Sequence, residues 1–520
     1  MIQRIQPEEL HELARSWGFS VEEVEAEQLL AVAEGVFQAF DLLESQEPAF
    51  VEPVEAVRDA GRRPDEGEDP LNAIVRFCRV RAEGAEGILS GKRIAVKDAI
   101  AIAGIPLTCG SRVLQGYVPV EDSVVADRIL RAGGEVVAIT NMDDLAFSGG
   151  GDSSWYGPTL NPWDRKRTAG GSSSGSAASL FYDGIDVSVG GDQGGSIRAP
   201  ASWCGVLGLK PTHGLVPYVG IAGIDQTFDH CGPMGRTAAD VAALLQAIAG
   251  KDDYDPRQRD VPAADYLSAI AEAPDSLAGV RLGVVAEGFA ETVGVESATA
   301  EAVRTTVERL RELGAEAVSV SLPEHLQAGG IAFIGFVEGM TNLMETGGNG
   351  YSWSGRYWQD LPPALANGLR EHALELSPQV KIALITGRWL RNRYAGALYA
   401  KAQNLRPWLR TAYDQALESV DALLLPTTPW RAHELAPHLP LADRVLRGWA
   451  NLSNTYPTDM TGHPALSLPL AEADGLPVGV MFVGRRFDDA RLLSLAATCE
   501  RALGWAPAGR SSATRRGRAR

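Results

Sequence analysis

Glycine and serine are crowded into one short stretch near the middle of the chain, GGDQGGSIRAPASWCG, which begins at Gly190. The apolar run IDVSV before it is typical of a buried strand, and SIRAPA has the composition of a helix start. A glycine-rich connection between a strand and a helix presents several backbone N–H groups at one point, which makes an anion site. The anion could be a phosphate of a bound ligand, or an oxyanion that exists only during a reaction.

Lys97 is a second residue with possible chemistry. The chain has only seven lysines, and Lys97 lies in the apolar segment RIAVKDAI, which is predicted to be a strand. Alternation along a strand places Lys97 on the same face as Ala95. Burial lowers the pKa of a lysine and can make it a neutral base near about pH 7–9, which an arginine cannot become. A structural salt bridge to Asp98 or Asp144 is the alternative explanation.

Two known motifs fit the serine- and glycine-rich stretches poorly. A phosphate-binding P-loop requires GxxxxGK[ST], and no lysine follows these glycines. The sequence GSSSG at residues 171–175 matches GxSxG with Ser173 in its centre. A nucleophile elbow must follow a buried strand, however, and the polar segment NPWDRKR precedes this one. We therefore expect neither a nucleotide site nor an α/β-hydrolase elbow.

The lysine and both serine-rich stretches together resemble the amidase signature family. The likeness lies in AVKDAI, AGGSSSGSAAS and GGDQGGSIRAPASWCGVLGLKPTHGLVP, and NPWDRKR, HCGPMGRT and TGHPALSLP extend it over roughly residues 70 to 505. The chain is similar in particular to bacterial amidases that accompany nitrile hydratases. Those proteins share an N-terminal helical extension and the GGDQGGS form of the loop.

The resemblance implies a Ser–Ser–Lys triad that hydrolyses carboxylic amides to the acid plus ammonia or an amine, with no metal and no cofactor. By position, Lys97 is the base, Ser172 is the proton-bridging serine and Ser196 is the nucleophile that forms an acyl-enzyme. In the family the bridging serine has a cis peptide bond, which a sequence cannot show. The oxyanion hole would consist of the N–H groups of the loop residues, Gln193, Gly194, Gly195 and Ser196.

Substrate contacts are expected from two aromatic-rich segments, NGYSWSGRYW and WANLSNTYPTDM. Trp353, Trp449 and Tyr456 in these segments, with the side chain of Gln193, are the predicted substrate-binding residues. An apolar or aromatic acyl group would suit them.

One position in the serine run departs from the family pattern. Ser174 stands where the family usually has glycine, which would cost about 1 kcal/mol if this position needs a positive φ. Asp192 and Arg198 flank the loop and are expected to hold its turn.

Other functions remain open at this stage. A glutaminase-type subunit of a tRNA-dependent amidotransferase resembles the same family, but it needs partner subunits and a pocket for the charged ends of glutamine. Hydrazides, anilides or esters could be hydrolysed instead of amides. A silent binding protein on the same fold is disfavoured, because all three triad positions are intact.

The elements expected to position these residues alternate between strand and helix from about residue 70 onwards. This pattern predicts an α/β fold: a large mixed, mostly parallel central sheet with helices on both faces. Residues 1–69 are predicted to be a helical extension and linker, residues 70–505 the catalytic domain, and residues 506–520 a disordered basic tail.

Composition excludes several other classes of protein. The net charge of −18 disfavours nucleic-acid binding, and no signal peptide or membrane span is evident. The five scattered cysteines indicate reduced thiols, no zinc site and a cytoplasmic location. The expected partner is a small-molecule amide. An apolar stripe on the first helix and the family resemblance together predict a homodimer.

Overall fold

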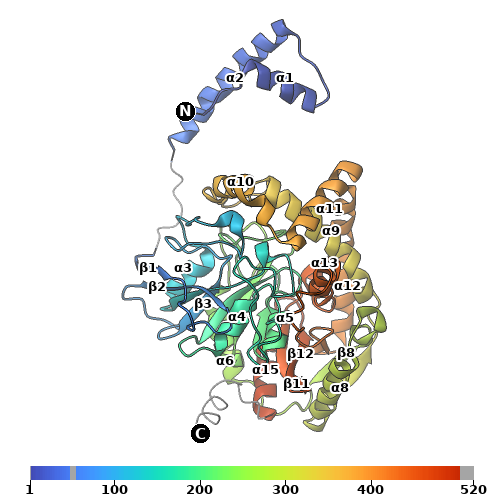
Figure 1. Ribbon diagram of the computed structural model, residues 1–520. Helices are drawn as coiled ribbons and strands as arrows, with labels where there is room; N and C mark the ends of the chain where they lie inside the picture. Colours follow the sequence, from blue (N-terminus) through green and yellow to red (C-terminus); the bar gives the residue numbers. More distant parts are fainter. Residues whose placement is uncertain (1, 47–53, 504–520) are drawn as a thin grey trace. The chain divides into compact units, whose positions relative to one another are not determined.

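The computed structural model describes residues 2–46 and 54–503 (Figure 1). The predicted basic tail, residues 506–520, lies outside the described residues. The chain divides into two compact units, Met1–Pro53 and Val54–Arg520.

The first unit is a pair of helices, α1 (Pro7–Ser16) and α2 (Glu23–Glu44). The guanidinium of Arg4 donates hydrogen bonds to the carboxylates of Glu34 and Asp41 on α2. Both helices expose large apolar side chains: Leu13, Val24, Leu29, Val32, Val36, Phe40, Leu42 and Leu43. The stripe predicted on the first helix is therefore present, and much of it is uncovered within this unit.

Within the described residues, the second unit contains one sheet of 12 strands in the order β1-β2-β4-β3-β5-β7-β6-β11-β12-β10-β8-β9. The strands are β1 (Ala56–Arg62), β2 (Ile74–Ala82), β3 (Arg93–Lys97), β4 (Glu135–Thr140), β5 (Val187–Asp192), β6 (Leu207–Lys210), β7 (His230–Gly235), β8 (Arg281–Val285), β9 (Glu316–Val320), β10 (Ala422–Pro426), β11 (Ala465–Ala473) and β12 (Leu476–Val483). The expected α/β class with a large mixed sheet is confirmed.

The expectation that this sheet is mostly parallel is wrong. Only β3–β4, β3–β5, β8–β9 and β8–β10 pair in parallel. The other seven neighbouring pairs are antiparallel. One reason is visible in the sequence: Asp474 and Gly475 alone connect β11 to β12, and both have positive φ. A two-residue Asp-Gly turn with this geometry joins antiparallel strands.

The sheet begins earlier than the boundary predicted near residue 70. Strand β1 pairs antiparallel with β2, and the guanidinium of Arg58 forms a two-point ion pair with Asp122. Charged side chains on an edge strand protect the edge from pairing with other chains. The same charges make the segment resemble a loop in the sequence. The segment predicted to be a linker therefore contributes a strand.

Helices cover both faces of the sheet (Figure 1). One face packs against α3 (Val124–Arg131), α6 (Ala238–Ile248), α7 (Tyr266–Ala271), α8 (Ser297–Glu312) and α15 (Asp489–Ala502). The opposite face packs against α4 (Ser174–Ala178), α5 (Arg198–Cys204) and α12 (Ala397–Glu418). The helices α9 (Glu324–Glu345), α10 (Leu361–His372) and α11 (Pro378–Tyr394) contribute to the apolar core on that side. Two short helices, α13 (Leu441–Ala450) and α14 (Tyr456–Thr461), precede β11.

The alternation of side chains along β3 determines on which face of the sheet Lys97 lies. Ile94 and Val96 of β3 belong to the core under α3 and α6, whereas Ala95 packs with α4 and α5 on the opposite face. Lys97 follows Ala95 by two residues, so both side chains lie on the same face of the sheet, which is the face of the serine- and glycine-rich segments. None of the described helices combines the length and the apolar character needed to cross a bilayer.

Candidate active site

Lys97 ends β3 in an almost fully buried position, with 1% of its surface exposed. Its Nζ lies 2.8 Å from Oγ of Ser172 and 3.3 Å from the carbonyl oxygen of Gly191. Asp98 and Asp144, the alternative salt-bridge partners, accept hydrogen bonds from other residues. The lysine is therefore directed at the serine run and the glycine loop.

The surroundings of Lys97 favour its neutral form. Burial lowers the pKa of Lys97 to about 8, although the charges of Asp143 and Asp192 oppose the shift. A lysine of this kind exchanges its proton near neutral pH.

The two serine-rich stretches lie side by side. Ser172 follows a cis peptide bond and is completely buried. The N–H of Ser173 donates to the carbonyl oxygen of Ser196 at 3.1 Å, and the hydroxyl of Ser173 donates to the carbonyl oxygen of Gly191 at 3.0 Å. These bonds hold the serine run against the glycine loop that carries Ser196.

Ser174, the departure from the family pattern, is accommodated without strain. It begins α4 in helical backbone and is not among the residues of positive φ. Its hydroxyl lies 3.0 Å from Oγ1 of Thr159. The cost considered for a serine at this position does not arise.

The loop between β5 and α5 has unused hydrogen-bond donors. Across the described ranges, the N–H groups of Gln193, Gly194, Gly195 and Ser196 donate to no other residue. Gly195 has a φ of 139°, and a Cβ there would lie 2.0 Å from Oγ1 of Thr455. Only glycine fits at this point of the turn.

A buried charge cluster holds the loop from behind. The carboxylate of Asp192 accepts hydrogen bonds from the N–H of Ile197 and from the guanidinium of Arg198. On its other side Arg198 donates to Asp459 at 2.7 Å and to the hydroxyl of Thr458 at 2.6 Å. The expected scaffold role of Asp192 and Arg198 agrees with this geometry, because the guanidinium is fully occupied and buried.

The two carboxyl groups of this cluster titrate in opposite directions. Burial alone would raise the pKa of Asp192, but the charge and hydrogen bonds of Arg198 lower it below its usual range. Burial and the neighbouring charge of Asp192 raise the pKa of Asp459 well above its usual range. One arginine therefore balances one ionised carboxylate, and the second carboxyl favours its neutral form.

A cavity of about 30 Å³ opens beside Ser196. Its lining contains no charged side chain and consists of Ala146, Phe147, Ser148, Gln193, Gly194, Ser196, Ile224, Phe333, Phe336, Trp449, Leu452 and Tyr456. The ring of Phe333 has its centroid 5.8 Å from those of Phe336 and Trp449 and 6.1 Å from that of Tyr456. We call this space the apolar cavity.

Three of the four predicted substrate-binding residues, Gln193, Trp449 and Tyr456, line the apolar cavity. The side-chain nitrogen of Gln193 donates to the hydroxyl of Tyr218 at 2.8 Å, and its Oε1 has no partner among the described residues. Trp353 lies elsewhere: its ring stacks on Tyr357 at 4.0 Å and lines a larger pocket.

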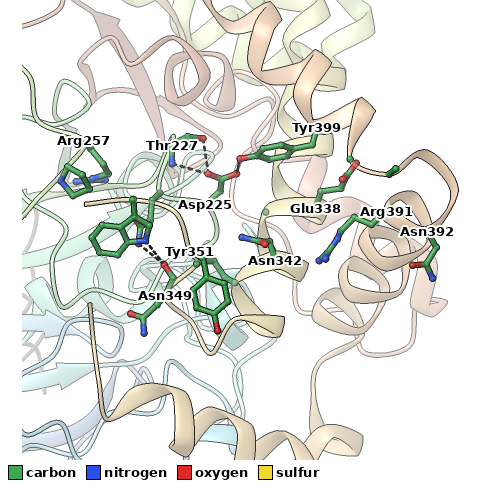
Figure 2. A pocket seen from close by; sticks show the side chains of 18 residues that line it. Asp225, Thr227, Arg257, Glu338, Asn342, Asn349, Tyr351, Arg391, Asn392 and Tyr399 are labelled. Carbon is green, nitrogen blue, oxygen red and sulfur yellow. Dashed lines mark hydrogen bonds between the residues drawn. The ribbon is translucent and has the colours of Figure 1, made fainter. Parts of the chain in front are cut away.

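That larger pocket has a volume of about 770 Å³ and shares no lining residue with the apolar cavity (Figure 2). Trp353 is placed there because the loop after α9 folds back on itself, with the indole N–H bonded to the carbonyl of Asn349 at 3.1 Å. We call this space the polar pocket.

Several residues of the site could not be found by sequence reasoning. Thr455 donates its hydroxyl to the carbonyl oxygen of Gly194 at 2.6 Å, and Phe333 and Phe336 form one wall of the apolar cavity. Thr455 lies in the segment WANLSNTYPTDM, where the aromatic residues give the stronger signal. The phenylalanines lie in an ordinary helical pattern that gives no such signal. Across the described ranges, no group of His, Cys, Asp and Glu residues could hold a metal ion.

Comparison with known proteins identifies relatives along most of the chain. The family model described as Amidase matches residues 74–493. An enantioselective amidase of Rhodococcus rhodochrous is 39% identical over 447 residues, which cover 85% of each chain. The A subunit of glutamyl-tRNA(Gln) amidotransferase from Synechococcus sp. (strain JA-2-3B'a(2-13)) is 38% identical over 432 residues, or 82% of each chain. The solved structure of native peptide amidase from Stenotrophomonas maltophilia matches with a TM-score of 0.63 and 29% identity, covering 81% of this chain and 84% of that one.

Proposed function

The chain belongs to the amidase signature family, and we propose that it hydrolyses amides of apolar or aromatic carboxylic acids through a seryl acyl-enzyme. It is a hydrolase of amide C–N bonds. The observation that carries the finer proposal is the apolar cavity, which places aromatic rings beside Ser196 and offers no charged side chain.

Acylation would begin at Ser196. Its Oγ attacks the amide carbonyl carbon while its proton passes to Ser172, which passes its own proton to neutral Lys97. The contact of 2.8 Å between Nζ of Lys97 and Oγ of Ser172 supports this relay, since a proton can cross a hydrogen bond of that length. The carbonyl oxygen gains the negative charge, and the free N–H groups of residues 193–196 would stabilise it.

The tetrahedral intermediate then collapses with loss of the amine. The C–N bond breaks, and Ser172 returns a proton to the leaving nitrogen, so that ammonia or an amine departs neutral. Water attacks the resulting ester of Ser196, gives its proton to the same relay, and releases the acid. No cofactor enters either half of the proposed reaction.

The runner-up function is the glutaminase subunit of an amidotransferase. The Synechococcus relative is nearly as similar in sequence as the Rhodococcus amidase, so identity does not decide between them. The apolar cavity favours the amidase, because the α-carboxylate and α-ammonium of glutamine would lose their hydration there without a charged partner.

Ammonia release from the purified full-length chain tests the proposal. We expect benzamide to be hydrolysed with a kcat/KM about 10²-fold or more above that for L-glutamine, because the glutamine charges would be desolvated without compensation. A Ser196→Ala variant purified in parallel controls for contaminating activity. A preference for glutamine would contradict the substrate class, and no release from any amide would contradict hydrolysis itself.

The two serines should differ in their response to substitution. Ser196→Ala should abolish covalent labelling by a fluorophosphonate, measured as added mass, because the nucleophile is gone. Ser172→Ala and Lys97→Ala should each lower kcat/KM by about 10²–10⁴-fold yet still label slowly, because each removes only a proton carrier. The double variant should be little worse than either single variant, since both residues act in one relay.

Ser174→Ala is the matched control for the serine set, since the hydroxyl of Ser174 contacts Thr159 and not the glycine loop, and this variant should keep its labelling. Ser173→Ala tests the GSSSG match. Labelling that is lost in Ser173→Ala or Ser172→Ala but kept in Ser196→Ala would reverse the assignment.

The pH dependence of kcat/KM should report Lys97. The base works in its neutral form, and burial lowers the pKa of Lys97 to about 8. Activity should therefore rise about tenfold per pH unit below pH 8 and level off above it. The measurement uses initial rates on an amide whose chemical step limits turnover. A profile that is flat or falls between pH 6 and pH 9 would remove Lys97 as the base.

We further propose that the helical unit Met1–Pro53 joins two copies of the chain. Its exposed apolar residues, such as Leu13 and Val32, need a cover in water, and the family resemblance favours a homodimer. Deletion of residues 1–53 leaves β1 and the whole sheet intact, so this variant should fold as a monomer by light scattering. A truncated chain that keeps the full-length assembly state would contradict the proposal.

A further inference from the structure

The polar pocket lies between α9, the loop at residues 225–227, the loop after α9 and the turn that joins α11 to α12. Figure 2 shows its labelled side chains converging from these elements, with Glu338 near one end and Asn349 towards the other. At about 770 Å³ it has room for a ligand of tens of atoms, and the proposed reaction uses none of its residues.

The two arginines that line the polar pocket are already paired. The guanidinium of Arg257 donates to both carboxylate oxygens of Asp255 and to the carbonyl of Asp229. Arg391 donates to the carboxylate of Glu345. Neither positive charge is therefore available as an anion site without breaking an ion pair.

The two acidic residues that line the polar pocket differ in their hydrogen bonds. Asp225 accepts hydrogen bonds from the N–H and hydroxyl of Thr227 and from the hydroxyl of Tyr399. Glu338 has only 3% of its surface exposed, yet its carboxyl group forms no hydrogen bond with any described residue, and its Oε1 is buried without a partner.

A buried carboxyl group without a partner is unfavourable by about 1–3 kcal/mol or more, so a donor that reaches it from the pocket would be bound. Burial raises the pKa of Glu338, and the nearby charge of Arg391 offsets this only in part. A positively charged donor would relieve this cost most completely, because it pairs with the ionised form.

The end of the polar pocket near Asn349 is aromatic. The indole of Trp353 is fixed by its stack on Tyr357 and by its hydrogen bond to Asn349. Tyr351 lies at the rim with 73% of its surface exposed. Flat rings at one end and an unpaired carboxyl group at the other complement an elongated molecule with an apolar body and a basic head.

We propose that the polar pocket is a second binding site, separate from the apolar cavity, for an elongated organic cation: a protonated primary amine that pairs with Glu338 and carries an apolar or aromatic body towards Trp353.

Isothermal titration of the full-length protein with 4-phenylbutylamine tests this site. We expect saturable binding of the amine, and binding at least tenfold weaker for 4-phenylbutanol and for 4-phenylbutyrate, which have the same body with a neutral or an anionic head. Excess benzamide, a probe for the apolar cavity, should not displace the amine. Equal binding of the anion, displacement by benzamide, or no binding of the amine would overturn the proposal.

Single substitutions test the carboxyl group of Glu338 and the ring of Trp353 separately. Glu338→Gln should weaken 4-phenylbutylamine at least tenfold, whereas Glu371→Gln, an exposed carboxylate outside the pocket, should leave its affinity unchanged. Trp353→Leu should weaken 4-phenylbutylamine but not n-butylamine, which lacks the aromatic body. Unchanged affinity in Glu338→Gln would overturn the proposal. The titration detects no turnover, so its result is independent of whether the chain hydrolyses the proposed amides.

Discussion

The directions of a few peptide planes in the loop at residues 192–196 determine what this site can do. In a trans peptide the C=O and the following N–H point in opposite directions, so holding a carbonyl on one side aims the next N–H to the other. Thr455 holds the carbonyl of Gly194 at 2.6 Å, and the N–H of Ala199 holds that of Gly195 at 2.7 Å. Two oxygens 2.6 Å apart need a proton between them, and only the hydroxyl of Thr455 can supply it. The N–H groups of Gly195 and Ser196 are thereby aimed away from these anchors and left free for another acceptor.

The loop at residues 192–196 is also held by buried charged groups, whose removal from water is unfavourable. Arg198 lies between Asp192 and Asp459 with no exposure to water, and removing one partner from such a cluster typically destabilises a protein by about 3–5 kcal/mol. This cluster fixes where α5 begins, and with it the position of Ser196. Lys97 is in the opposite situation: it is buried with no carboxylate in contact, and its lowered pKa follows from that isolation. The arginine stays charged because it is paired, and the lysine can lose its proton near pH 8 because it is not.

The residues that meet at this site could be singled out from local patterns in the sequence, whereas the roles predicted for Lys97, Ser172 and Ser196 came from the resemblance to the amidase signature family. No tertiary information was needed to predict on which face of its strand Lys97 lies, or to find the two serine- and glycine-rich runs. The fold class followed from alternating strands and helices, but the share of parallel pairs did not, since pairing partners such as β6 and β11 are far apart in the chain. Thr455 and Asp459 hold a loop that is distant in the sequence, and no local pattern links them to it. Trp353 was assigned to the substrate by its aromatic type alone, and the fold of its own loop placed it in the polar pocket instead.

In the proposed reaction, specificity and catalysis would share one structural segment, and this would limit how the site can change. The stretch from α13 to α14 lines the apolar cavity with Trp449 and Tyr456, while the hydroxyl of Thr455 between them holds the carbonyl of Gly194 in the loop at residues 192–196. A backbone shift that enlarged the cavity on this side would move the anchor of Gly194 as well. Helix α9 has fewer contacts with the loop at residues 192–196 than the stretch from α13 to α14 has. Phe336 packs against Gly194, where a Cβ would lie 2.8 Å from its ring, but the ring contacts of Phe333 are with other aromatic side chains of the cavity wall. The wall of the apolar cavity can therefore vary at Phe333 with the least effect on the loop at residues 192–196, and under the proposed function a change of substrate class would be most accessible through that helix.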